Sequence, residues 1–468
     1  MTMAIVFVLM DLFLVAITYG VYGGKTKYYE GMILGVHMEE QYAKGTTVTA
    51  FIQDYKKKLK RFYVWNLIVG ILLCGLCFWY FSIFMIAWCV WLIEFMAGSL
   101  YLIYRNHRRL YDMKVAYGWS SEESGQMMMV DTRLSSGSVQ AALPLWLHLL
   151  TLAVLAAPFV TEKVRAGIKD IPGMGAIFGA GIAVWVTFLF CAWIFRRQRN
   201  RVYSEDSQIN RRLNDLEKRY WSAGFLTESI CNDIATLYLI YAGVKNGWIS
   251  NVDMVIYTVI LFLAVLGIFV GYWYLRKVKQ AILQMDKTPL FVDDDYYWRN
   301  GWYSNPDDSR LFIQDRFNGM NCTTNLGRPV GRCMVGGVLA GTMILLVWVC
   351  IMMLRMDFVP VHLADSGSSF KITSGYTNTE IKKEDIKSVK LLKNGLPKEH
   401  FSKTNGSADE KQLLGKFDGA ESGKCRMYVW LEQSEVIQIK TKKYTVFMNN
   451  KDKDQTTAWY EQLKKAEP

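Results

Sequence analysis

The sequence predicts a polytopic α-helical membrane protein of about eight transmembrane helices, with a small cytoplasmic β-hairpin module and a C-terminal α+β domain. Apolar residues in the 468-residue chain gather in blocks of about 18 or more with few charges, the length that a helix needs to cross the hydrocarbon of a bilayer. Lys and Arg concentrate in alternate loops between these blocks. After residue 355 the long apolar runs give way to short segments in which apolar and polar residues alternate.

Eight apolar blocks are expected to span the membrane. The stretch of 43 residues from Phe62 to Tyr104 would be about 65 Å long as one helix, so it must hold two spans joined by a turn near residues 80–82. The predicted spans are Met3–Gly23, Tyr63–Tyr80, Ser82–Tyr104, Leu143–Val160, Met174–Phe195, Ala223–Val244, Met254–Leu275 and Cys333–Leu354. The fourth span is interrupted by Pro144, His148 and Pro158. The resulting domains are 1–275 (membrane), 276–332 (cytoplasmic), 333–354 (last span) and 355–468 (extracytoplasmic).

The loops between the spans differ sharply in basic residues. Lys and Arg number 8, 5, 8 and 9, or 30 together, in segments 24–62, 105–142, 196–222 and 276–332, against 3 and 1 in segments 161–173 and 245–252. Basic loops stay on the cytoplasmic side, so both termini are expected outside. The net charge of +12 then reflects attraction of the inner face to anionic lipids, and nucleic-acid binding is not predicted.

Two of the basic loops also carry apolar residues at helical spacing. Phe51, Tyr55 and Leu59 recur at every fourth position beside a run of lysines, and "RRLNDLEKRYW" in the loop 196–222 has the same character. Such segments are typical of amphipathic helices that lie along the membrane interface, with their stems buried and their charged groups at lipid phosphates.

The C-terminal part predicts a small β-barrel or sandwich with a helical lid. Alternation in "SVKLL", "RMYVWLE", "EVIQIKT" and "KYTVFMN" predicts antiparallel strands of about 5–7 residues. One terminal helix follows, with Asp454 as its N-cap and with Trp459 and Leu463 on one apolar stripe. About 110 residues suffice for a core of its own.

One stretch of the basic loops, "VDDDYYWRNGWYSNPDD" from Val292, is rich in Asp, aromatic and turn residues. Its continuation alternates like a hairpin around Asn318-Gly319. We expect a compact cytoplasmic unit against the bilayer, with Trp298, Trp302 and Tyr303 at headgroup level. The aspartates are adjacent and no Glu follows, so a calcium loop is not predicted. A phosphate loop would need a Gly-rich turn with Lys, which is absent from the sequence.

The same stretch resembles a domain of unknown function found in bacterial multi-pass membrane proteins. Their pattern is Asp-rich, then Tyr-Trp, Gly-aromatic-Tyr, Asn-Pro-Asp, an apolar strand, Arg-Phe-x-Gly and Thr-x-Asn. The matching positions are Asp294, Tyr297, Trp298, Gly301, Tyr303, Asn305, Pro306, Asp308, Arg316, Phe317, Gly319, Thr323 and Asn325. From Phe370 to Lys465 the chain is similar to a bacterial pleckstrin-homology-like domain attached to such proteins, notably in "EDIKSVKLLKNGLP". The resemblance implies a bacterial cytoplasmic-membrane protein in which the motif has a structural or binding role.

Five polar residues form a candidate intramembrane site: Asp11, Glu94, Glu228, Asn232 and Asp233. The first, second and fifth lie near the middle of their predicted spans, where an ionised carboxylate costs several kcal/mol. No Lys or Arg lies in any predicted span to neutralise them. They are either protonated acids that hydrogen-bond between helices, worth about 1 kcal/mol each, or a site for a proton, a cation or a cationic peptide.

No catalytic residue, metal site or cofactor is predicted. The histidines are far apart in sequence, at His37, His107, His148, His362 and His400, and no motif of a metalloprotease, serine hydrolase or Cys/His metal site occurs. The pair Cys74 and Cys77 lies in an apolar span, where packing is expected. Cys425 is the one cysteine in 355–468, so no disulfide within that domain is expected.

These observations predict a non-enzymatic envelope sensor, regulator or immunity-type protein whose extracytoplasmic domain binds a peptide or protein. Relatives often carry Pro-x-His and Gly-x-Pro-Asp between spans, a pattern shared with immunity proteins of the sporulation-delaying-toxin type, whereas this chain has "TEKVRAGIKDIPG" there. The alternative is a proton- or cation-coupled transporter, which requires Asp11, Glu94 and Asp233 to line one solvent-reachable cavity.

Overall fold

The computed structural model of the chain describes residues 2–119, 141–171, 174–198, 200–247, 249–286, 294–319, 322–408 and 411–467. Two compact units make up the structure. The first contains Met1–Leu152, Val184–Asn232 and Ile260–Leu345, and the second contains Ala153–Ala183, Asp233–Val259 and Leu346–Pro468. The second unit therefore includes the whole C-terminal β domain.

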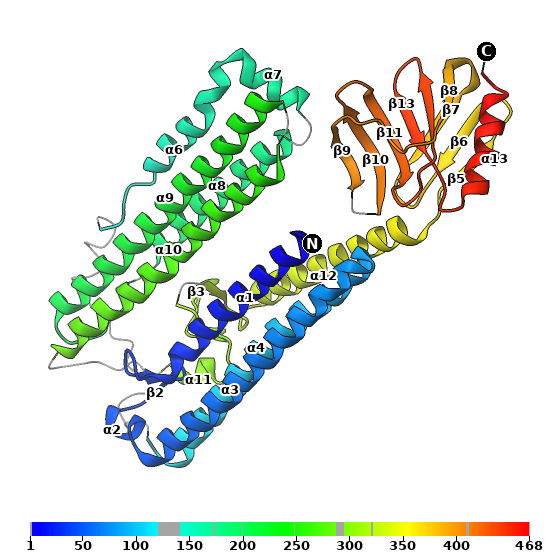
Figure 1. Ribbon diagram of the computed structural model, residues 1–468. Helices are drawn as coiled ribbons and strands as arrows, with labels where there is room; N and C mark the ends of the chain where they lie inside the picture. The colour runs from blue at the N-terminus through cyan, green and yellow to red at the C-terminus, as the bar shows by residue number, and fades with distance from the viewer. Residues whose placement is uncertain are drawn as a thin grey trace. The chain divides into compact units, whose positions relative to one another are not determined.

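Seven long helices run through the described residues (Figure 1). They are α1 (Thr2–Gly23), α3 (Thr46–Leu73), α4 (Phe81–Ala116), α8 (Met174–Arg197), α9 (Ser207–Asn246), α10 (Asn251–Gln284) and α12 (Pro329–Phe358). All except α9 are long and apolar enough to cross a membrane, which makes six candidate spans in this part of the chain. A seventh is the broken pair of α6 (Leu147–Ala156) with η3 (Ala157–Val160) and α7 (Glu162–Asp170), bent by 95°. The predicted count of about eight spans is thus not confirmed.

Two predicted spans account for this difference. The fourth, with Pro144 and Pro158, is the bent pair, because proline cannot continue a helix. The sixth lies inside α9, where Glu228, Asn232 and Asp233 make the helix less apolar than its neighbours. The other six predicted spans each lie within one of the apolar helices or its 3-10 continuation.

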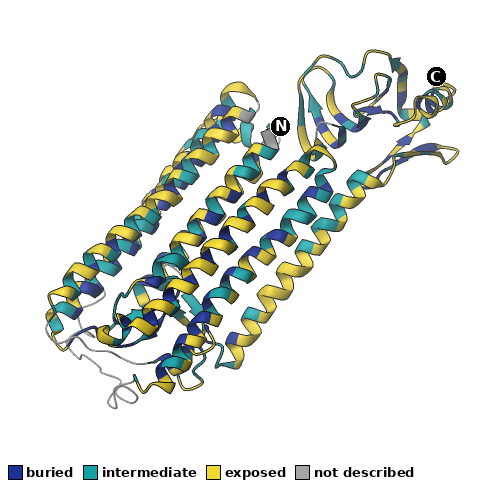
Figure 2. Cartoon of the chain, turned by 60° about the horizontal axis from the view of Figure 1, so that its bottom comes forward, coloured by how far each residue is buried: buried dark blue, intermediate teal, exposed yellow. Residues whose placement is uncertain are grey.

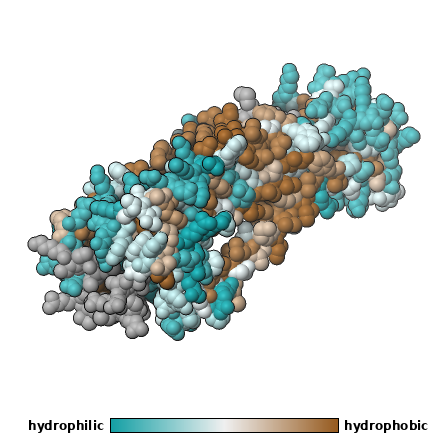
Figure 3. Space-filling view, turned by 90° about the horizontal axis from the view of Figure 1, so that it is seen from below, coloured by the Kyte–Doolittle hydropathy of each residue, from teal (hydrophilic) through white to brown (hydrophobic). Residues whose placement is uncertain are grey.

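Apolar side chains cover the outside of the spanning helices. Leu263 on α10 and Val338 and Ile344 on α12 are all more than half exposed, at 63%, 62% and 71%. Figure 2 shows long stretches of helix in the colour of exposed residues, and Figure 3 shows hydrophobic residues gathered in one continuous area. Such surfaces belong in lipid, where α-helices satisfy their own backbone hydrogen bonds. These are the length and surface of the helices of a membrane protein.

The turn predicted near residues 80–82 is present, since α3 continues as η2 (Cys74–Phe78) and α4 begins at Phe81. The basic segment before it is not a separate interfacial helix, however. One helix, α3, begins at Thr46 and carries a continuous buried stripe that includes Val48, Ile52, Tyr55 and Leu59. No Gly or Pro interrupts it before Gly70, so the helix propagates into the span. In the same way α9 begins at Ser207 and runs through without a break.

A tight hairpin lies between α1 and α3. After η1 (Gly24–Thr26), strands β1 (Met32–Ile33) and β2 (Val36–His37) pair antiparallel, and α2 (Glu40–Ala43) follows. The two turn residues, Leu34 and Gly35, have φ of 51° and 75°, as a type I′ turn requires. Leu34 is fully buried in this conformation, which is uncommon for a residue with a side chain.

The module predicted in segment 276–332 contains α11 (Asp295–Trp298) and the antiparallel strands β3 (Phe312–Gln314) and β4 (Cys322–Thr324). The hairpin predicted around Asn318-Gly319 is therefore confirmed. Trp298 and Tyr303 do not lie at headgroup level, because they are only 3% and 4% exposed and pack in the core of the first unit, whereas Trp302 is 41% exposed. That core also receives side chains of α1, α3, α4 and the β1–β2 hairpin, so the module is built into the helices.

The C-terminal domain consists of two sheets and a helix. Its elements are β5 (His362–Asp365), β6 (Ser369–Thr373), β7 (Asn378–Lys382), η4 (Lys383–Asp385), β8 (Ile386–Leu392), β9 (Phe401–Ala408), β10 (Gln412–Gly419), β11 (Gly423–Trp430), β12 (Val436–Thr441), β13 (Thr445–Met448) and α13 (Lys453–Lys464). β5, β6 and β7 form an antiparallel sheet, and a six-stranded sheet has the order β8-β12-β13-β11-β10-β9. All pairs in it are antiparallel except β11 with β13.

The predicted strands of this domain overlap β8, β11, β12 and β13, and three of them extend one or two residues beyond the observed strand. Trp459 and Leu463 of α13 are buried in its core, as the sequence predicts. The N-cap of α13 is Asp452, however, and not Asp454: the Asp452 carboxylate accepts the Asp454 backbone N–H at 3.0 Å. The helix begins two residues earlier than an N-cap at Asp454 would place it.

The domain is attached closely to the end of α12. α12 ends at Phe358 and β5 begins at His362, with Pro360 in the connection. The Gln412 side-chain amide donates to the Met356 carbonyl at 3.2 Å. The β6–β7 loop packs on the same turn, where a Cβ added to Gly375 would lie 1.7 Å from a helix carbonyl oxygen. Only glycine fits there.

Candidate functional site

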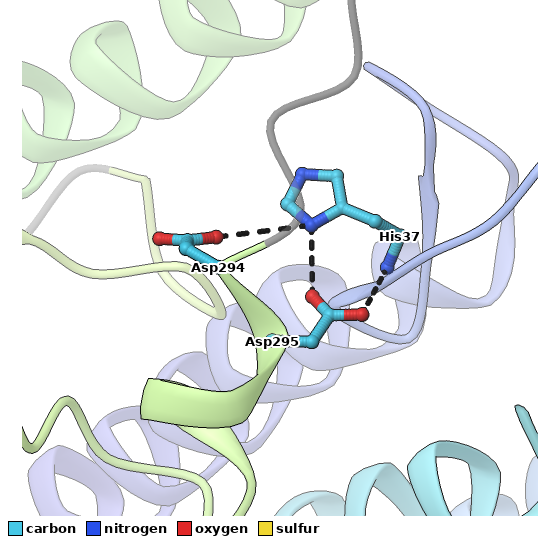
Figure 4. Close-up of side chains that lie close together, drawn as sticks. All are labelled: His37, Asp294 and Asp295. Atoms are coloured by element: carbon cyan, nitrogen blue, oxygen red, sulfur yellow. Dashed lines mark hydrogen bonds and ion pairs between the residues drawn. The ribbon is translucent and has the colours of Figure 1, made fainter. Parts of the chain in front are cut away.

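A buried ionic network centred on Asp295 joins four segments of the first unit. Asp295, at the start of α11, has no exposed surface. Its Oδ1 accepts from Arg316 Nη1 at 2.5 Å and lies 2.8 Å from His37 Nδ1, while its Oδ2 accepts from Lys114 Nζ at 2.8 Å and from the His37 backbone N–H at 2.9 Å. Figure 4 shows the His37 ring beside the carboxylates of Asp294 and Asp295. The network thus ties β2, α4, α11 and the β3–β4 connection together.

The charges of this network are paired inside the protein. The Lys114 and Arg316 side chains are only 4% and 5% exposed. Burial alone would raise the pKa of Asp295, but its contacts with His37, Arg316 and Lys114 outweigh burial and hold this pKa well below its ordinary value. Arg316 also pairs with the half-exposed Asp294. A buried carboxylate with two buried cations is therefore ionised and structural.

A metal ion is not favoured here, although His37, Asp294 and Asp295 offer ligand atoms within 4.8 Å of one another. Both oxygens of Asp295 already accept hydrogen bonds from cationic groups. A divalent cation would have to replace Lys114 and Arg316, which lie within 3 Å of the same carboxylate. The donor set therefore suits an ion-pair network.

Further motif residues shape the backbone around this network. Arg316 lies over the Trp298 ring, with Cζ 5.0 Å from the centroid, and donates to the Gly35 carbonyl at 2.9 Å. Gly301 has φ of 90°, and an added Cβ would lie 2.2 Å from Tyr104 of α4. Gly301 is thus required both for its conformation and for close packing on the helix.

Asn325 organises the second half of the motif. It is fully buried, and its Oδ1 accepts the Asn305 backbone N–H at 3.0 Å while its Nδ2 donates to the Asn305 and Asp308 carbonyls at 2.7 and 3.1 Å. The Asn305 side chain accepts from the backbone N–H after Pro306 at 2.9 Å, an Asx turn. These bonds fix a loop that has little regular structure.

The remaining motif residues add packing and one ion pair. Tyr303 donates to Asp308 at 2.9 Å. Burial opposes ionisation of Asp308, yet hydrogen bonds led by Arg310 lower its pKa to about 2. Tyr297 packs against Tyr303, with centroids 6.2 Å apart. Gly319 approaches another ring, since an added Cβ would lie 2.5 Å from a tyrosine hydroxyl of α10. The motif is thus a structural unit with the ion network at its centre.

Sequence reasoning did not find three residues of this site: His37, His107 and Lys114. His107 is fully buried, and its ring nitrogens lie 3.0 Å from the Leu34 and Trp298 carbonyl oxygens. The available signal was the spacing of seven residues between His107 and Lys114, which places both on one face of α4 beyond the predicted span. Their partners lie far away in sequence, so the pattern alone could not indicate a site.

A second network lies in the same unit, around Lys279 of α10. Its Nζ lies 2.6 Å from Glu30 and 3.0 Å from Glu217, and donates to the Tyr203 hydroxyl at 3.2 Å. Gln314 of β3 donates to Glu217 at 2.9 Å. Burial would raise the pKa of Glu217, but Lys279 and other cations outweigh it and lower this pKa to about 2. This network links β3 of the same module to α9 and α10.

The side-chain hydrogen bonds of Asp11 are made with residues other than the predicted intramembrane ones. Asp11 is fully buried and accepts from Trp88 Nε1 at 2.9 Å and from the Cys74 thiol at 3.6 Å. Glu94 lies on the exposed face of α4, away from these partners. Glu228, Asn232 and Asp233 are buried along α9.

α6 makes polar contacts with α9 and with α8. Ser229 of α9, next to Glu228, lies 3.0 Å from His148 Nδ1, and Trp185 Nε1 of α8 donates to Thr151 of α6 at 2.9 Å. Hydrogen bonds of this kind join helices within a bilayer. Ser229 therefore contributes to helix packing, while both predicted roles of Glu228, Asn232 and Asp233 stay predictions.

Comparison with known protein families, with curated proteins and with solved structures finds no match to this chain.

Proposed function

We propose that this chain is a non-enzymatic regulatory protein of the bacterial cytoplasmic membrane, a sensor or immunity-type protein whose C-terminal domain binds a peptide or protein. One observation carries the proposal: the charged groups of the cytoplasmic motif form ion pairs within the protein. Asp295, Lys114 and Arg316 are buried and paired, and they fasten the module to α4. A movement of the helices would therefore pass to the module.

The C-terminal domain supports the binding part of this proposal. It has two sheets, a terminal helix and a core of its own, as a pleckstrin-homology-like domain would. The parallel pairing of β11 with β13 departs from an all-antiparallel arrangement. The imbalance of basic residues between loops favours an extracytoplasmic domain, and a ligand there would be a peptide or protein of the envelope.

The orientation is tested with a protease-sensitive tag fused after Pro468. Cys425 is a poor reporter, because the residue is only 2% exposed. In intact spheroplasts, added protease should remove the tag, while a tag inserted after Gly45, between α2 and α3 in the basic segment 24–62, should survive until the cells are opened. A protected C-terminal tag would contradict the extracytoplasmic binding domain.

The alternative function is a proton- or cation-coupled transporter, favoured by the buried carboxylate of Asp11 inside a span. The two functions are separated by complementing a deletion strain under envelope stress. A sensor predicts that Asp233→Asn complements and that a chain lacking 360–468 does not. A transporter predicts the reverse, together with a dye-detected ion flux in proteoliposomes that Asp233→Asn abolishes. The second pattern would overturn the regulatory proposal.

A further inference from the structure

Glu94 lies in the middle of a span, on a face of α4 that the described residues leave exposed. α4 buries Trp91 and Phe95 on one side, whereas Val90, Glu94 and Ala97 are exposed on the other. Glu94 is the fourteenth residue of α4, about 20 Å along the helix from its start. A carboxyl group at this depth would face hydrocarbon.

Nothing in the described part of the chain satisfies this carboxyl group. Its neighbours along the exposed face are Val90, Ala97 and Tyr101, and no hydrogen bond or ion pair of Glu94 is found among the described residues. Ionisable groups within membrane spans face protein or water and rarely lipid, because lipid offers no hydrogen-bond partner. The exposed face of α4 therefore requires a polar partner at the depth of Glu94.

We propose that this face is the interface of a symmetric homodimer, in which the carboxyl groups of two Glu94 residues hydrogen-bond to each other. All copies of a membrane protein insert in one direction, so the two-fold axis of a dimer lies along the membrane normal and each residue near it meets its own copy. Equal depth is thus guaranteed for Glu94. A protonated carboxyl group is both donor and acceptor, so a second copy satisfies it completely.

The rest of the face fits a helix–helix contact. Val90, Glu94, Ala97, Tyr101 and Arg105 follow one another at steps of four, three, four and four residues, which keeps them on one stripe of the helix. Ala97, next to Glu94, is small enough for close approach.

The basic residues at the inner end do not prevent such a contact. Arg105 donates to the Tyr101 hydroxyl of its own helix at 2.8 Å. Arg108, one turn further, is held by Asp112 at 3.0 Å. Both guanidinium groups are thus engaged along α4, which reduces their repulsion between copies.

The test measures self-association of the full chain in proteoliposomes, by energy transfer between fluorescent proteins fused after Pro468, over a range of lipid dilution. Glu94→Leu removes the hydrogen bonds and should weaken association about 5- to 30-fold. Glu94→Gln, whose amide both donates and accepts, should stay within about threefold of the wild type. Met96→Leu, on another side of α4, should have no effect.

A second measurement locates the face independently of variant stability. A photoreactive residue at position 97 should cross-link two copies of the chain, and one at position 96 should not. The proposal is overturned by a wild-type chain that is monomeric at every dilution, by equal association of the wild type and Glu94→Leu, or by cross-links from position 97 to a different protein.

Discussion

The substitution Asp295→Asn tests whether the ion network holds the module of α11, β3 and β4 on the helices. It removes the buried carboxylate that pairs with Lys114 and Arg316, which are 4% and 5% exposed, while Arg316 keeps its pair with the more exposed Asp294. Breaking a buried ion pair from one side costs about 3–5 kcal/mol. Asp294→Asn is the matched control, because this neighbouring carboxylate pairs with the same Arg316 but is 39% exposed. Its loss should cost about 0–1 kcal/mol.

The assay is hydrogen–deuterium exchange of residues 31–38 in detergent micelles, which include the His37 amide that donates to Asp295. At about 1.4 kcal/mol per factor of ten, the expected cost corresponds to exchange about 100- to 4000-fold faster in Asp295→Asn. Asp294→Asn should exchange at nearly the wild-type rate. Adding Lys114→Met to Asp295→Asn should restore part of the protection, since one unpaired cation is removed. Equal exchange in the two single variants would refute a network in which burial makes Asp295 decisive.

Three further predictions concern other parts of the chain. The pKa of Glu217 in the folded protein is about 2, against an ordinary value of 4.5. The ionised carboxylate therefore stabilises the fold fully above about pH 4.5, and this contribution is lost as pH falls toward 2. The difference in melting temperature between wild type and Glu217→Gln should shrink below about pH 4. Asp452→Ala should cost about 1 kcal/mol and speed amide exchange at the start of α13, whereas an equal effect of Asp454→Ala would contradict the observed cap. Gly301→Ala should lower the melting temperature far more than Gly367→Ala, which has a similar φ of 78° but nothing within 4 Å, and similar losses would show that backbone strain alone matters.

The helical part of the fold was predictable because solvation by lipid acts on each segment separately. Apolar length alone locates α1, α4 and α12, and it also requires the break between α3 and α4. It fails at α9, where the buried polar residues Glu228, Asn232 and Asp233 make the helix too polar to be counted as a span. It also could not show where a basic amphipathic segment ends and a span begins.

In the C-terminal domain, alternation located strands with one strongly apolar face. β9, "FSKTNGSA", is mostly polar and was missed, because it is held by pairing with β10 more than by burial of its own side chains. The alternation of apolar and polar residues also gives no information about the order of strands in a sheet. The parallel pairing of β11 with β13 depends on which strands meet after folding.

The sequence motif identified the aspartates and the arginine of the candidate site, but it did not identify the basic residues that contact them. Asp294 and Arg316 belong to a motif that the sequence displays, and the structure joins them. Lys114 and His37 come from distant segments, and the local sequence around each does not distinguish it from other residues of the basic loops. Long-range charge pairing of this kind leaves no local pattern.

The tight junction between α12 and the C-terminal domain has a mechanical consequence. Pro360 lies in a three-residue connection and Gly375 packs against the last helical turn, so the domain cannot rotate independently of α12. A ligand that pulls on or rotates the domain would therefore move α12 with it. Lengthening this connection with flexible residues would uncouple the C-terminal domain from α12 without disturbing either of them. Such a variant would separate binding of a ligand by the domain from the response of the helices.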